Sequence, residues 1–289
     1  MNQTNKKLLL FISFLAITFT VCAQPSVKEI EAYIEQVRID WNVPGMSVAI
    51  VKDGKVFSSK GYGVLKASES IKVDKNSLFA IASNTKAFVS SAIGILHQEG
   101  KLHLDDHVQK YIPEFKLYDA YASSEASIRD LLCHRLGLGT YSGDVIWYKS
   151  DFTAREVVSK IKFVPQVYSF RGGYGYSNLM FITAGEVIKE ASGMAWDDFV
   201  KARFFNPLGM TRTITSTNDL AKKGNFAIPH KPVEDSNIPI DWVNWDNMGA
   251  AGGIISSADD MANWLLFQLH NGVLAKDTIL DPVVQNMLW

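Results

Sequence analysis

The segment Leu78-Phe-Ala-Ile-Ala-Ser83-Asn-Thr-Lys86-Ala-Phe88 decides how this chain of 289 residues is organised, because it joins a strand-like apolar stretch to an apolar helix. The helical spacing after Lys86 continues to Gly100, which suits a helix end. Residues i and i+3 share one helix face, so the Lys86 amine should reach the Ser83 hydroxyl. A buried lysine without its proton can activate such a serine as a nucleophile. The alternative interpretation is a helix-capping serine beside a lysine that reaches solvent.

A second motif, Tyr174-Gly-Tyr176-Ser-Asn178, follows a glycine pair and leads into an apolar run that ends at Ile188. Glycines ahead of an apolar run indicate a loop that enters another helix. Taken alone, this pattern is typical of a buried tyrosine and a capped helix start. Its combination with Ser83 and Lys86 favours a catalytic site, because the two motifs together resemble those of a known enzyme family.

With both motifs in place, the chain resembles the serine β-lactamase and penicillin-binding superfamily. The similar branch contains class C β-lactamases, D-alanyl-D-alanine carboxypeptidases and related esterases, whose motifs are S-x-x-K and Y-x-N. The resemblance covers residues 30 to 289. It is supported by a hairpin segment with its turn at Asp53-Gly54, by Gly61-Tyr-Gly63, and by the segments 102–115, 128–138 and 247–261.

The resemblance implies an α/β (α+β) fold of the β-lactamase/transpeptidase type, with an antiparallel sheet flanked by helices and a helical subdomain over roughly residues 84–240. It also implies acyl transfer, in which Ser83 attacks a carbonyl and water later hydrolyses the acyl-enzyme. Lys86 and Tyr176 would pass the proton, and which of them is the base stays open. Asn178 would bind the substrate amide and steady Lys86.

The third motif of the family, K-T-G or H-x-G on a later strand, does not occur before Trp289. Lys222-Lys-Gly224 lies in a polar loop and His270-Asn-Gly272 follows a helix, so neither is expected to be catalytic. We therefore expect residues 24–289 to be one β-lactamase-related domain that is C-terminally truncated and lacks its C-terminal strands. The hairpin would then have an open edge, and the oxyanion hole would be half made.

The N-terminus matches a signal peptide at residues 1–23, with Lys6-Lys7, an apolar run and a small residue at Ala23. It predicts a periplasmic or secreted protein that starts at Gln24. Lipidation at Cys22 stays open, although bulky Val21 argues against it. Removal of the signal leaves Cys133 as the only cysteine, and its neighbours predict a position in the core.

Composition excludes several classes of partner and cofactor. The net charge of −1 offers no basic surface for nucleic acid, and the only membrane-directed segment is the signal peptide. His103 and His107 have i, i+4 spacing, but Leu104 stands where a zinc protease needs glutamate, so no metal or other cofactor is expected. His134 should lie beside the substrate cleft, and a structural role is its simpler explanation.

The sequence predicts a secreted serine hydrolase that forms an acyl-enzyme with amide, β-lactam or ester substrates, and cell-wall D-amino-acid peptides are one candidate. Its partner would be a small-molecule or peptide substrate. The alternative is a penicillin-binding protein without turnover, or an otherwise inactive truncated binding protein. Substrate and oligomeric state stay open, because loops determine specificity in this family.

Overall fold

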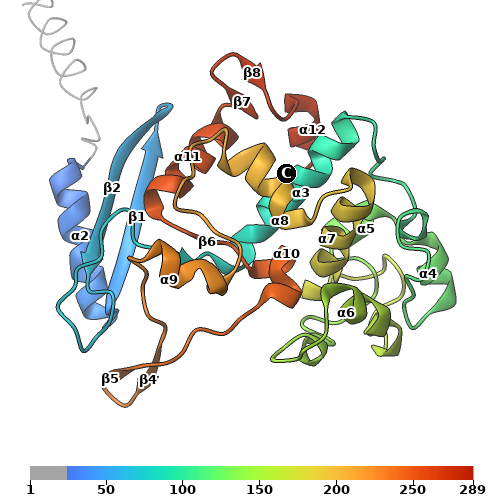
Figure 1. Cartoon of the computed structure of the whole chain (residues 1–289), viewed down its shortest axis with the longest axis horizontal. Helices are drawn as coiled ribbons and strands as arrows, with labels where there is room; N and C mark the ends of the chain where they lie inside the picture. The colour runs from blue at the N-terminus through green and yellow to red at the C-terminus, as the bar shows by residue number, and fades with distance from the viewer. Residues whose placement is uncertain (1–24, 289) are drawn as a thin grey trace, which may run out of the picture.

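The computed structural model describes residues 25–288 (Figure 1). The predicted signal peptide and Cys22 lie outside these residues. Among the described residues, no helix has the length and apolar character needed to cross a bilayer. The described helices are α2 (Val27–Asp40), α3 (Thr85–Gln98), α4 (Ala120–Glu125), α5 (Ile128–Leu132), α6 (Ala154–Lys160), α7 (Asn178–Ser192), α8 (Trp196–Val200), α9 (Leu220–Lys223), α10 (Gly249–Gly252), α11 (Ala258–Leu269) and α12 (Pro282–Met287).

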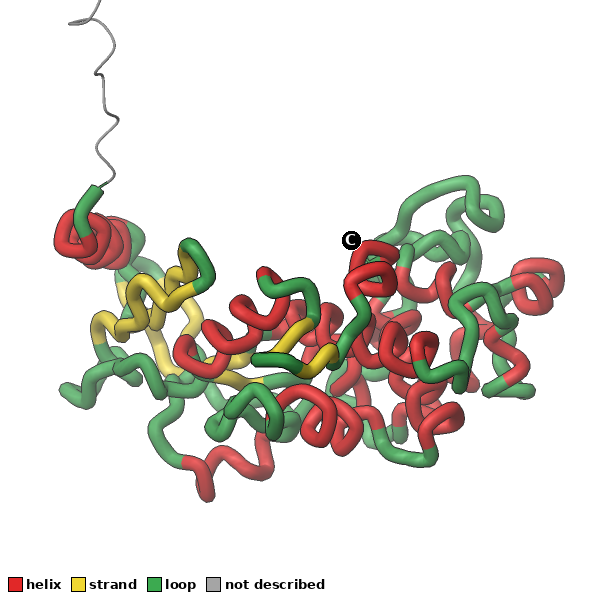
Figure 2. Tube along the Cα trace, turned by 90° about the horizontal axis from the view of Figure 1, so that it is seen from above, coloured by secondary structure: helices red, strands yellow, loops and turns green. Residues whose placement is uncertain are grey.

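The strands pair two by two, and every named pair is antiparallel: β1 with β2, β3 with β6, β4 with β5, and β7 with β8. Their bounds are β1 (Gly45–Lys52), β2 (Lys55–Gly63), β3 (Phe79–Ala80), β4 (His230–Val233), β5 (Ser236–Pro239), β6 (Ile255–Ser256), β7 (Val273–Leu274) and β8 (Asp277–Thr278). Figure 2 shows the longest strands at one end of the molecule and a mass of helices at the other. This mixture of helices and antiparallel strands confirms the predicted α/β class.

The β1–β2 hairpin turns at Asp53 and Gly54, as the sequence predicted. Both residues have positive φ, 51° and 70°, which suits a tight turn between twisted antiparallel strands. Helix α2 packs on β2, and α11 contacts both strands (Figure 1). Within residues 25–288 the other edge of β1 pairs with no strand, which agrees with the predicted open edge.

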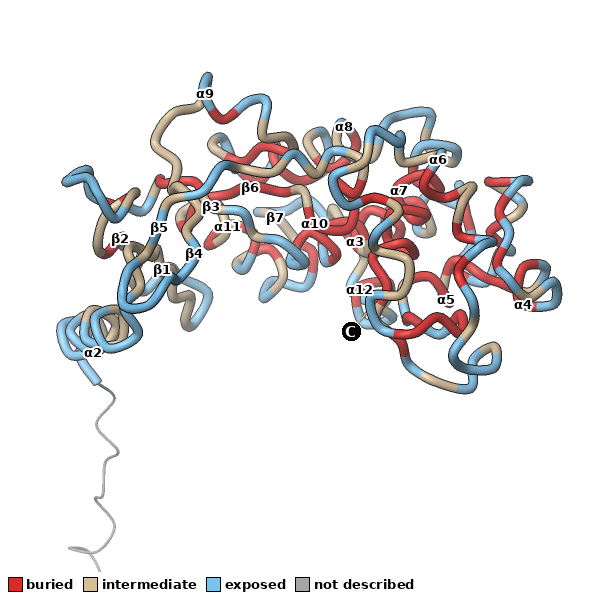
Figure 3. Tube along the Cα trace, turned by 90° about the horizontal axis from the view of Figure 1, so that it is seen from below, coloured by how far each residue is buried: buried red, intermediate tan, exposed pale blue. Residues whose placement is uncertain are grey.

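The core lies around α3, α7 and α10, where Figure 3 shows the buried residues concentrated. Phe88 of α3 is fully buried and stacks on Trp264 of α11, with ring centroids 3.8 Å apart. Helices α7 and α10 approach closely, since a Cβ added at Gly185 would lie 2.5 Å from the Cβ of Ala250. This packing brings the first turns of α3 and α7 together with α10, and the candidate site lies at their meeting point.

Side-chain caps fix the starts of α5 and α11, whereas the prediction that Cys133 lies in the core is wrong. Ser127 and Asp130 form a reciprocal capping box at α5, and Ser257 caps α11 by accepting from the Asp260 N–H. Cys133 is exposed rather than in the core. Helix α5 ends at Leu132, so the helical periodicity behind that prediction does not extend to the cysteine.

Candidate active site

Ser83 lies in a tight turn between β3 and α3. The turn spans Ala82–Asn84 and is anchored by two hydrogen bonds at Ile81: its N–H donates to the Ile254 carbonyl at 3.0 Å, and its carbonyl accepts from Asn84 Nδ2 at 2.8 Å. Ala82 has a φ of 46°, a conformation that costs a residue with a side chain about 1 kcal/mol or more. The fold therefore maintains local strain to present an exposed Ser83 hydroxyl.

The structure brings the predicted site residues into mutual contact. Ser83 Oγ lies 2.5 Å from Tyr176 Oη, and Lys86 Nζ donates to Ser83 Oγ at 3.1 Å. Ser83 and Lys86 meet because they are one turn apart, but Tyr176 arrives from the loop before α7. The serine hydroxyl therefore has two groups within reach of its proton.

Lys86 is a buried lysine with three hydrogen-bond acceptors. It is 8% exposed, and besides Ser83 Oγ its amine donates to Asn178 Oδ1 at 2.9 Å and to the Ala251 carbonyl at 2.7 Å. Burial lowers the pKa of Lys86 to about 8, although the Asp144 carboxylate acts in the opposite direction. At pH 7 about one molecule in ten therefore has the uncharged amine that can accept a proton.

Asn178 contacts this lysine from the first turn of α7, and Asp144 in turn holds Asn178. Asn178 is the first residue of α7, and its Nδ2 donates to Asp144 Oδ2 at 2.9 Å. The other Asp144 oxygen accepts from Trp147 Nε1 at 3.0 Å. The predicted contact between Asn178 and Lys86 is present. Asp144 was missed, because no spacing rule links it to a residue 34 positions later.

The charge of Asp144 can be tested through the titration of Lys86. We expect Asp144→Asn to lower the pKa of Lys86 below 8, because the carboxylate favours the charged amine. An NMR titration of the lysine Nζ resonances measures this directly, with Asp151→Asn on the same loop as a control. An unchanged or raised pKa in Asp144→Asn would contradict the electrostatic role.

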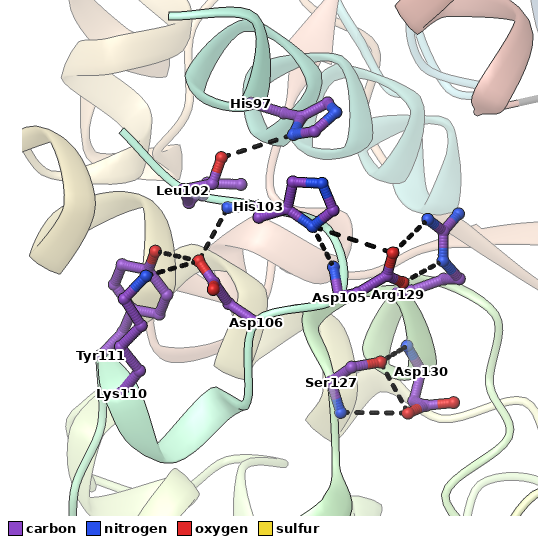
Figure 4. A network of polar contacts seen from close by, with 10 residues as sticks. All are labelled: His97, Leu102, His103, Asp105, Asp106, Lys110, Tyr111, Ser127, Arg129 and Asp130. Carbon is purple, nitrogen blue, oxygen red and sulfur yellow. Dashed lines mark hydrogen bonds and ion pairs between the residues drawn. The ribbon is translucent and has the colours of Figure 1, made fainter. Parts of the chain in front are cut away.

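His103 and His107, whose spacing raised the question of a metal site, make separate contacts. His103 Nδ1 accepts from the Asp105 N–H at 3.3 Å (Figure 4), whereas His107 Nδ1 lies 2.5 Å from the Ser124 carbonyl. Figure 4 shows that Asp105 also binds Arg129 of α5, so this network ties the loop to the helix. Across residues 25–288 no cluster of three or more His, Cys, Asp or Glu side chains is placed to hold a metal ion.

An apolar cavity of about 290 Å³ lies beside the strand that leads to Ser83. Its lining includes Phe79, Ala80, Trp242, Trp245, Gly252 and Ile255. Gly252 connects the cavity to the nucleophile turn, because a Cβ added there would lie 3.7 Å from the Ala82 carbonyl carbon.

The chain belongs to the beta-lactamase family, whose model matches residues 30–289. Protein flp of Staphylococcus aureus strain N315 is 30% identical over 256 residues, a match that covers 85% of this chain and 49% of that protein. The chain thus spans about half the length of the curated relatives it matches.

Solved structures confirm the β-lactamase/transpeptidase-like fold. An octameric penicillin-binding protein homologue from Pyrococcus abyssi superposes with a TM-score of 0.78 at 24% identity, covering 91% of this chain and 59% of the other. The D-amino acid amidase of Ochrobactrum anthropi SV3 superposes with a TM-score of 0.71 at 25% identity, and the match covers 88% of this chain and 71% of the amidase.

Proposed function

We propose that this protein is a serine hydrolase that cleaves amide or ester bonds through an acyl-enzyme on Ser83. The observation that carries the proposal is the placement of Ser83 Oγ 2.5 Å from Tyr176 Oη and 3.1 Å from Lys86 Nζ. An alcohol is a weak nucleophile at neutral pH, and this arrangement gives it a proton acceptor from the start. The substrate is a small molecule or a peptide.

The reaction proceeds in two steps, acylation of Ser83 and hydrolysis of the acyl-enzyme. In the first step, Ser83 Oγ forms a bond to the carbonyl carbon, its proton passes to the Lys86–Tyr176 pair, and that proton leaves with the departing amine or alcohol. In the second step, water attacks the acyl carbon, the bond between that carbon and Ser83 Oγ breaks to release the acid, and the proton from water returns to Ser83 Oγ through the same pair. The Ser83 N–H, at the start of the helical segment, is a donor for the developing oxyanion.

Amides are the better supported substrates, since the structural relative at 25% identity is a D-amino acid amidase. Among amides, D-amino-acid peptides of the cell wall and β-lactams both offer a carbonyl carbon that a serine can attack. Esters use the same two steps with an easier leaving group. The family branch that the motifs indicate includes all three substrate types, and the loops around the site decide between them.

The proposal is tested by intact mass spectrometry of residues 24–289 over time, with a fluorophosphonate, a penicillin and a chromogenic ester. A fluorophosphonate adduct of one equivalent is expected, because this reagent reports the activated serine. Penicillin and ester adducts that form and decay support a hydrolase, whereas adducts that persist support a binding protein without turnover. A folded sample that forms no adduct with any of the three overturns the proposal.

We also propose that the protein acts outside the cytoplasm, in the periplasm or after secretion. The support is the N-terminal pattern from Lys6 to Ala23, which matches a cleaved signal. Mass spectrometry of the N-terminal peptide from the extracytoplasmic fraction should find Gln24 as the first residue. A lipid-modified Cys22 would indicate an anchored protein, and an intact Met1 would contradict export by cleavage.

The apolar cavity beside the strand that leads to Ser83 predicts a preference for longer acyl chains. We expect kcat/KM to rise from acetate to hexanoate p-nitrophenyl esters, because each buried methylene contributes about 0.8 kcal/mol. Ala80→Leu adds volume to the cavity wall and should reduce the hexanoate-to-acetate ratio by about tenfold or more. Acetate is the internal control, since it is too short to fill the cavity. An unchanged ratio would show that acyl groups bind elsewhere.

A further inference from the structure

His134 is a buried side chain that has no part in the reaction steps above. It lies just after α5, is 8% exposed, and has a φ of 57°. Left-handed backbone is uncommon for a residue with a side chain, so the surrounding structure must hold it in place. The sequence favoured a satisfied structural histidine, and its contacts show what it supports.

Those contacts converge on three consecutive residues of the loop before α7, namely Gly175, Tyr176 and Ser177, which we call the tyrosine loop. The His134 carbonyl accepts from the Gly175 N–H at 3.1 Å, and its ring Nδ1 accepts from the Ser177 N–H at 3.1 Å. Between them, the imidazole packs against the Tyr176 ring, with centroids 4.8 Å apart and planes inclined at 34°. The left-handed turn allows carbonyl and ring to face the same loop.

We propose that His134 is the positioning residue for Tyr176. It holds the tyrosine loop at the residue before Tyr176 and at the residue after it, so that the phenol oxygen meets Ser83. The inference rests on the proposed function. Among the described contacts the imidazole bonds neither Ser83 nor the phenol oxygen, so it acts through Tyr176 and is not itself a catalytic residue. Phe181 of α7 also packs against the imidazole, with ring centroids 5.3 Å apart.

The protonation state suits this role. An Nδ1 that accepts from a backbone N–H requires the neutral ring with its proton on Nε2. Burial, together with the nearby charge of Lys86, lowers the pKa of His134 to about 4. The acceptor therefore persists throughout the neutral range, and the loop contact does not depend on small changes of pH there.

The first test compares His134→Asn with His134→Leu. Asparagine places an oxygen near the position of Nδ1 and tolerates positive φ, whereas leucine removes the acceptor and leaves the buried Ser177 N–H unpaired. We expect the leucine variant to lose about tenfold to a hundredfold in the rate of fluorophosphonate labelling at Ser83, and asparagine to recover most of it. Equal rates in wild type and His134→Leu would overturn the proposal.

The second test is a double-mutant cycle that combines His134→Leu with Tyr176→Phe. If His134 had only a general structural role, the losses in labelling rate of the two variants would add. If His134 acts through the phenol, His134→Leu should cost little more in the Tyr176→Phe background. Fully additive losses would contradict the proposal. If circular dichroism shows that the leucine variant does not fold, the cycle is run with His134→Asn. Its smaller loss of labelling rate must then disappear in the Tyr176→Phe background. A wild type that forms no Ser83 adduct would instead contradict the proposed function.

Discussion

Ser83→Ala is expected to remove all covalent labelling by the fluorophosphonate and to reduce hydrolysis at least about a thousandfold. The reason is chemical: the step needs an oxygen whose proton has somewhere to go, and Ser83 Oγ has both Tyr176 and Lys86 within hydrogen-bond distance. Intact mass spectrometry measures the adduct, and initial rates with a chromogenic ester measure the hydrolysis.

The change should leave the fold intact. Ser83 is exposed, and Lys86 keeps its acceptors Asn178 and Ala251. The matched control is Ser124→Ala, an exposed serine whose hydroxyl donates to the Tyr121 carbonyl at 3.0 Å, and it should label like wild type. An adduct of unchanged yield on Ser83→Ala would place the nucleophile elsewhere.

Removing the amine of Lys86 should be almost as damaging. We expect Lys86→Met to slow acylation by about a hundredfold to ten-thousandfold, the range of a lost general base. In wild type, kcat/KM should increase as the pH rises through about 8, because the pKa of Lys86 is lowered to that value and only the neutral amine can accept the proton. Below pH 8 the rate should fall about tenfold per pH unit.

Lys86→Arg decides between the two candidate bases. Arginine keeps a positive charge but does not lose its proton, so it should be as inactive as methionine if Lys86 is the base. High activity in Lys86→Arg would assign the base to Tyr176, with Lys86 supplying only charge. A wild-type rate that is flat between pH 6 and 9 would contradict the need for a neutral Lys86.

Features that depend on neighbouring residues in the chain were predicted well. The hairpin turn at Asp53-Gly54 follows from residues that accept positive φ. The capping box of Ser127 and Asp130 is likewise local, because its two residues are three positions apart. The prediction that Cys133 is buried was wrong for a local reason too, because α5 ends one residue before it.

The serine and lysine of the site belong to the same local class. Ser83 and Lys86 are three residues apart, so the helical geometry alone places their side chains together. Tyr176 and Asn178 could be added only through the resemblance to a known family. Neither periodicity nor spacing connects a loop at residue 176 with a helix that begins at residue 85.

By itself, the sequence determined the turns, the helix starts and the pairing of a hydroxyl with an amine, because these depend on contacts within a few residues. Only the tertiary structure decided that Asp144 holds Asn178, that the Ala251 carbonyl binds Lys86, and that His134 faces the tyrosine loop. The physical reason is burial. The pKa of Lys86 falls because α3, α7 and α10 together exclude water from its amine, and no single segment of the chain can do that.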